Sequence, residues 1–199
     1  MFYIDDRKPF VTFLVEGRLF RVHRYLFELE SEVFKSMFEI PQGDTTVEGE
    51  TDESPIILPS VTVAEMETLL NFFYFRQGLE EVEFSEANWR DLLSISHRYE
   101  CDRARKRSIK EINDLNPPVD NADMVAMSRK FEVEEWLLPA CVALVERQDP
   151  LSYTEAEKLG LSMTVLLSEA REKYIQSPAH NQQPNENATR LVKEVLHIS

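Results

Sequence analysis

Residues 20–38 have the sequence FRVHRYLFELESEVFKSMF, and this stretch decides the fold of the first half of the chain. A predicted strand ends at His23, a basic and aromatic corner follows, and two short helices meet around Ser31. The apolar residues recur at spacings of three and four, which is typical of the buried face of a helix. They are Leu26, Leu29, Val33, Phe34, Met37 and Phe38. The stretch therefore predicts packing, and none of its residues is arranged for catalysis.

The composition of the 199-residue chain predicts a packed core. Apolar residues make up 43%, including 12 Phe, 6 Tyr and 2 Trp, which argues against disorder. A chain of this length buries about two thirds of its unfolded surface, so it needs no disulfide or metal to fold. The length suits one domain with an extension, or two small domains.

The charge of the chain and its cysteine content limit the kinds of partner and the cellular compartment that we expect. The chain has 22 Lys and Arg against 36 Asp and Glu, a formal net charge of −14 that repels a phosphate backbone. We therefore expect no nucleic-acid partner. Cys101 and Cys141 lie among apolar helical positions and predict buried free thiols in a reducing compartment, the cytoplasm or the nucleus or both. The sequence predicts no signal peptide, no membrane span and no membrane partner.

A small sheet is predicted within residues 10–58. Phe10–Val15 is an almost unbroken run of strand-forming apolar residues, so we expect a strand buried largely on both faces. Gly17 fits the tight turn to a second strand that ends at His23. Residues 42–54 contain five acids and no basic residue, which predicts a solvated, mobile loop. A third, short strand follows at residues 55–58.

The remaining chain is predicted to be helical. Three helices fill residues 62–115, and the Asn-Pro-Pro sequence at 116–118 indicates a boundary. Further helices are expected at 122–131, 133–147 and 162–174. Thr154 and Glu157 have capping-box spacing, and Gly160 fits a helix stop. Residues 177–199 are expected to be a flexible tail with one short amphipathic helix, because their first part is polar and interrupted by proline.

The order of these elements and the motif after the second strand resemble the BTB/POZ domain. The residues that carry this likeness are Val22, His23, Arg24, Ser31, Phe34, Met37, Phe38 and 72–74. The resemblance implies an α+β fold, in which helices flank a small sheet, over residues 8–116. An all-helical extension would follow at 117–176. It also implies a non-enzymatic module that binds proteins, either a second copy or another BTB protein.

The chain further resembles the BTB-containing proteins found in large sets in mushroom-forming fungi. The phrases PIILPSVT (55–62), KFEVEEWLLPA (130–140), PLSYTEAEKLG (150–160) and SEARE (168–172) carry this likeness. One departure from the wider family matters. BTB proteins that recruit cullin ubiquitin ligases carry a hydrophobic-x-Glu motif after the second helix, and here Val47-Glu48-Gly49 has Gly in place of Glu. A cullin-adaptor role and a role as accessory to a transcription regulator remain alternatives.

The residues that could be catalytic or bind a metal also fit structural roles. His23 could be a general base, but no nucleophile accompanies it in sequence, so we expect it to fix a corner by hydrogen bonds. His97, Cys101 and Cys141 could approach a zinc site but lack paired ligand spacing. The basic cluster at 103–110 fits a solvated helix face, and the two Trp residues fit a core. We expect no catalytic residue, cofactor or metal.

The candidate interface combines the N-terminal hydrophobes with the first helix. Phe2, Tyr3 and Ile4 have no evident strand partner within one copy of the chain, and exposed apolar patches favour association. The first-helix candidates are Tyr25, Leu26 and Leu29. The alternative is that Leu26 and Leu29 belong to the core of the monomer.

Overall fold

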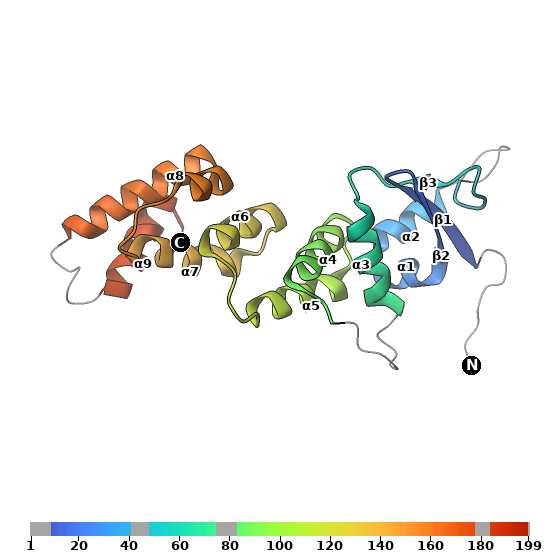
Figure 1. Cartoon of the computed structure of the whole chain (residues 1–199), viewed down its shortest axis with the longest axis horizontal. Coiled ribbons are helices and arrows are strands. Elements are labelled where there is room, and N and C mark those ends of the chain that lie inside the picture. Colours follow the sequence, from blue (N-terminus) through green and yellow to red (C-terminus); the bar gives the residue numbers. More distant parts are fainter. Residues whose placement is uncertain (1–8, 41–47, 75–82, 178–183, 199) are drawn as a thin grey trace. The chain divides into compact units, whose positions relative to one another are not determined.

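The computed structural model describes residues 9–40, 48–74, 83–177 and 184–198, within two compact units, Met1–Leu115 and Asn116–Ser199. In the first unit the described residues form three strands and five helices, and in the second they form four helices (Figure 1). The elements of the first unit are β1 (Phe10–Val15), β2 (Arg18–His23), α1 (Arg24–Glu30), α2 (Glu32–Glu39), β3 (Ile56–Ile57), α3 (Val63–Tyr74), α4 (Glu86–Arg98) and α5 (Asp102–Asn113). Those of the second are α6 (Asn121–Phe131), α7 (Glu134–Glu146), α8 (Tyr153–Gln176) and α9 (Pro184–Leu196).

The sheet has the strand order β2-β1-β3, with β1 antiparallel to β2 and parallel to β3. The strand β1 is buried on both faces, with Val11 and Phe13 on one face and Thr12 on the other, which explains its nearly continuous apolar sequence. Phe13 lies opposite Phe20 on one side and Ile56 on the other, and all three side chains are buried. Gly17 closes the hairpin with a φ of +81°, as the sequence predicts.

Aromatic rings fill the space between the sheet and the first helices. The ring of Phe13 in β1 lies 5.1 Å from that of Phe27 in α1 and 5.6 Å from that of Phe34 in α2, measured between centroids. Phe27 also meets Phe73 of α3 edge to face at 5.3 Å, and Phe34 stacks on Tyr99 at 4.5 Å. In Figure 1, α1 and α2 lie beside the sheet, with α3 between them and the α4 and α5 pair.

One predicted core position is wrong. Leu29 is 73% exposed, whereas Phe27 is fully buried. The apolar spacing of three and four was followed from α1 into α2, but Ser31 between them is extended, with a φ of −151°. Because the helix stops at this residue, the angular register of α1 does not continue into α2. The same Ser31 caps α2, since its hydroxyl accepts the Phe34 N–H at 3.1 Å.

In the described end of the acidic segment, residues 48–54, the acidic side chains are exposed to solvent as predicted, but the backbone at Gly49 packs against the sheet. The Thr12 N–H of β1 donates to the Gly49 carbonyl at 2.7 Å, and the Gly49 N–H donates to the Ser54 carbonyl at 2.6 Å. Gly49 is buried and has a φ of +85°. The expected loop residues 42–47 lie outside the described residues.

In the second unit, α7 packs with α6, α8 and α9 around one core. Trp136 of α7 is buried, as predicted. The predicted tail differs most from the structure. Its helix, α9, packs against α7 and α8 and buries Leu191, Val192 and Val195. The amphipathic pattern was visible in the sequence, but the surface of α7 that α9 contacts is built from residues distant in sequence.

The cap of α8 lies two residues before the predicted position. Ser152 and Glu155 form the capping box in place of Thr154 and Glu157. Glu155 is also held by Arg147 through two hydrogen bonds of 2.5 and 2.6 Å, and this pairing holds its pKa far below the usual range, at about 2. Arg147 therefore selects the capping pair. Gly160 has a non-helical backbone, with a φ of +76° and a ψ of 160°, and interrupts α8 between two helical stretches, as expected of a helix stop.

We predict that Gly49→Ala lowers the free energy of unfolding of the first unit by about 2–4 kcal/mol. An added Cβ would lie 2.9 Å from the Val11 side chain at a left-handed backbone position. Denaturant unfolding monitored by Trp89 fluorescence, in a Trp136→Phe background, measures the change. Gly17→Ala is the matched control, because its φ is equally positive but nothing lies within 4 Å of the added Cβ. A Gly49→Ala loss no larger than the control's would contradict the packing argument.

Candidate functional site

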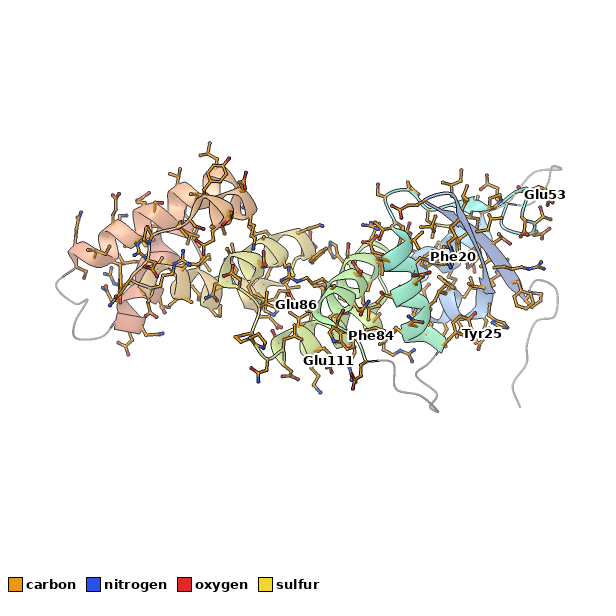
Figure 2. All side chains as sticks on the ribbon, in the orientation of Figure 1. Phe20, Tyr25, Glu53, Phe84, Glu86 and Glu111 are labelled. Atoms are coloured by element: carbon orange, nitrogen blue, oxygen red, sulfur yellow. The ribbon has the colours of Figure 1, made fainter. Side chains whose placement is uncertain are left out.

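Four side chains, each from a different element, gather where β2 meets α1, and we call them the aromatic corner: Phe10, His23, Tyr25 and Tyr74. The His23 ring lies 4.8 Å from that of Phe10, 5.7 Å from that of Tyr74 and 6.0 Å from that of Tyr25. Phe10, Tyr25 and Tyr74 are 40%, 52% and 38% exposed. Figure 2 shows Tyr25 at the edge of the first unit, in contrast to Phe20 inside it. The corner is thus an accessible aromatic surface on a fixed frame.

Hydrogen bonds between His23 and Tyr74 fix this corner. The Tyr74 hydroxyl accepts the backbone N–H of His23 at 2.9 Å and lies 2.8 Å from Nδ1 of the same residue. The pairing joins the start of α1 to the end of α3. Both the main chain and the ring of His23 are engaged in positioning, which is the structural role expected from the sequence.

Helical geometry explains which α1 residues face outward. Successive helical residues are turned by about 100°, so positions two before and two after a buried residue point away from it. Phe27 is fully buried, and Tyr25 and Leu29 are consequently 52% and 73% exposed. Leu26 lies between these extremes, half-buried against the core. The other candidates, Phe2, Tyr3 and Ile4, lie outside the described residues.

Ion pairs neutralise the carboxylates around the exposed side of α1. Glu28 pairs with Arg24 at 2.6 Å, Glu32 with Lys35 at 3.1 Å, and Glu30 with Arg103 of α5. A chain with a net charge of −14 therefore presents Tyr25 and Leu29 on a locally neutral surface. Like-charge repulsion at this surface is small as a result.

The residues that carry the family resemblance occupy structural positions. Val22 and Phe34 are buried, Ser31 caps α2, and Met37 and Phe38 pack partly buried against the core. Arg24 covers the Phe38 ring at 4.7 Å and donates to the Phe38 carbonyl at 3.3 Å. These contacts hold the end of α2 against the start of α1.

Comparison with protein families gives the same answer as the fold. The BTB/POZ domain model matches residues 10–115, more than half of the chain. The chain belongs to the BTB/POZ family. A BTB/POZ domain is generally a protein–protein interaction module and is typically non-enzymatic. A comparison with curated proteins finds no match.

Gly49, the residue compared above with the Glu of the cullin-recruiting motif, lies at a crowded backbone position. The backbone there is left-handed, and the side chains of Val11 and Ile56 lie 2.9 and 3.0 Å from where a Cβ would stand. A side chain at this position would require the Val11 and Ile56 side chains to move and would hold the residue in a backbone conformation that residues with a Cβ rarely adopt. In this BTB domain the segment serves to close the sheet edge beside Thr12.

The other residues considered for chemistry have packing roles. Cys101 and Cys141 are free and buried, as predicted, and burial raises the pKa of each thiol to about 12. Trp89 is half-buried, with its ring 4.7 Å from that of Phe84. Among the described residues, no three side chains of His, Cys, Asp or Glu come together as metal ligands would. None of the helices in the described ranges combines the length and apolar composition of a bilayer span.

Sequence reasoning missed two members of the aromatic corner. Phe10 was assigned to a buried strand, but it is the first residue of β1 and lies on the face opposite Val11 and Phe13. Tyr74 was not among the candidate residues, yet it ends α3 and turns its hydroxyl to His23. The position of each at the end of its element was the available signal, since burial usually falls there.

We expect Tyr74→Phe to lower the free energy of unfolding of the BTB domain by about 1 kcal/mol, because it removes the partner of the His23 N–H and ring nitrogen. Chemical denaturation followed by fluorescence measures this loss. Tyr25→Phe is the control, because the Tyr25 hydroxyl has no hydrogen bond among the described residues. Its effect on the free energy of unfolding should stay below about 0.5 kcal/mol. Equal effects of the two substitutions would show that the hydroxyl of Tyr74 does not fix the corner.

Proposed function

We propose that this BTB protein is a scaffold or adaptor that self-associates, or pairs with another BTB protein, through α1. Tyr25 and Leu29 would form the centre of the contact, with Leu26 and Phe10 beside them and Phe2, Tyr3 and Ile4 contributed by the N-terminal segment. The single observation that carries the proposal is the exposure of Leu29 and Tyr25 beside carboxylates that are already paired.

The distribution of charge favours this surface for association. Two copies with a charge of −14 repel each other, and a contact forms most easily where charge is locally cancelled. Arg24, Lys35 and Arg103 provide that cancellation from within one copy, so a partner need not supply cations. The surface would therefore accept a second neutral, apolar surface, such as its own copy.

The aromatic corner supports the proposal in a second way. Tyr side chains give large contact areas and lose little conformational freedom on binding, which is why they are enriched at binding hot spots. Tyr25 rests edge-on against the His23 ring, which is itself held by Tyr74. A preordered Tyr25 would reduce the entropy cost of association.

Two further parts of the proposal rest on the sequence. The phrases at 55–62, 130–140, 150–160 and 168–172 support membership of the fungal group of BTB proteins. The two free, buried cysteines support a reducing compartment, the cytoplasm or the nucleus.

We predict that Leu29→Asp converts the associated protein to a monomer with unchanged helical content, because it places a charge at the centre of the contact while leaving the core intact. Sedimentation velocity at tens of micromolar, with circular dichroism, measures both properties. Ile57→Asp is the matched control, since Ile57 is 68% exposed on β3, away from α1. Leu26 is a poorer test site, because its partial burial would also destabilise the fold.

The proposal of self-association fails if the wild-type chain sediments as a monomer at these concentrations. It also fails if the Ile57→Asp protein dissociates as readily as the Leu29→Asp protein, because the contact would then not be centred on α1.

A further inference from the structure

The helix α8 of the second unit has two apolar faces, although only one of them is packed. Its inner face buries Met163, Leu167, Ala170 and Tyr174 against α6, α7 and α9. On the opposite side, Leu161, Val165 and Ile175 are 82%, 56% and 59% exposed. In Figure 1, α8 runs along the edge of the second unit. A surface helix normally carries polar residues on its solvent side, so this face needs an explanation.

The spacing of the outer residues is that of a helix-pairing seam. Starting at Leu161, steps of four, three, four and three lead through Val165, Ser168 and Glu172 to Ile175. This alternation is the repeat by which one helix packs along another. We call these five residues the outer seam of α8. It is about 21 Å long at 1.5 Å per residue.

Glu172 decides which helix fits the outer seam. It is exposed, and no cation of the described residues pairs with it. Its basic neighbours are engaged elsewhere: Lys173 binds Glu169 and Glu194, and Arg171 donates to the carbonyls of Leu144 and Arg147. An occupant that covers the seam must therefore bring its own positive charge, because an unpaired carboxylate is costly to bury.

A second copy of α8 does not meet this requirement. In a parallel pair the two Glu172 side chains would lie in the same layer and repel each other. In an antiparallel pair centred on Ser168, each Glu172 would be buried against Val165 of the other copy. Both arrangements bury an unpaired carboxylate, and polar residues at seam positions are known to select partners in this way.

We propose that the outer seam of α8 binds one helix of a partner protein, with apolar residues at its seam positions and a Lys or Arg facing Glu172. Leu161 and Val165 hold the apolar end of that helix, and Glu172 fixes its register by pairing with the cation. The second unit thus has a binding surface of its own, separate from α1 of the BTB domain.

Stapled, fluorescein-labelled helical peptides of two heptads test the proposal by fluorescence anisotropy with the full-length chain. The Lys peptide has apolar seam residues and a single Lys in the layer that faces Glu172. The Glu peptide is identical except that Glu replaces this Lys. Each peptide is made in one version for parallel and one for antiparallel alignment with α8. We expect the Lys peptide to bind about tenfold more tightly than the Glu peptide, a preference that Glu172→Lys reverses.

Leu161→Ser should weaken binding of the Lys peptide about tenfold. The helical content of the protein should not change, because the Leu161 side chain is exposed. Glu157→Lys, an equal charge change on α8 outside the seam, should leave binding of the Lys peptide within about twofold of wild type. Equal binding of the Lys and Glu peptides, or binding that survives Leu161→Ser, would overturn the proposal. So would a wild-type oligomer that Leu161→Ser dissociates in sedimentation, because a second copy would then occupy the seam.

Discussion

The BTB domain depends on one cluster of rings, those of Phe13, Phe27, Phe34, Phe73 and Tyr99. Each ring comes from a different part of the domain, and together they join β1, α1, α2, α3 and the end of α4. Such rings bury large apolar areas and prefer offset or edge-to-face contacts, so the cluster fixes helix rotation as well as helix position. The rotation of α1 follows from it, because Phe27 can face inward only when Tyr25 and Leu29 face outward.

The net charge of the chain does not describe the charge of its individual surfaces. A net charge of −14 describes the chain in bulk, yet near α1 the carboxylates of Glu28, Glu30 and Glu32 are paired within the same copy. On α8 the reverse holds, since Glu172 has no cation among the described residues. Two exposed apolar surfaces of one chain thus differ in what they accept: one is suited to a neutral surface and the other to a cationic helix.

Local sequence signals predicted most of the fold. An unbroken apolar run predicted β1, and Gly17 predicted the tight turn that leads to β2. The errors have non-local causes. The register of α1 depends on the break at Ser31, the cap of α8 depends on Arg147, and Gly49 is required by Val11 and Ile56 across the sheet edge. The exposed residues of α1 were predicted as candidates, but their neutral surroundings depend on Arg103, which is distant in sequence.

The distribution of the cysteines has a practical consequence. The first unit contains Cys101 and the second contains Cys141, each buried and each with a pKa raised to about 12 by burial. A thiol in this condition reacts with an alkylating reagent only after the surrounding structure opens. The rate of alkylation at each cysteine, resolved by mass spectrometry, therefore measures the opening of its own unit in the intact chain. The two cysteines therefore report separately on the opening of the two units.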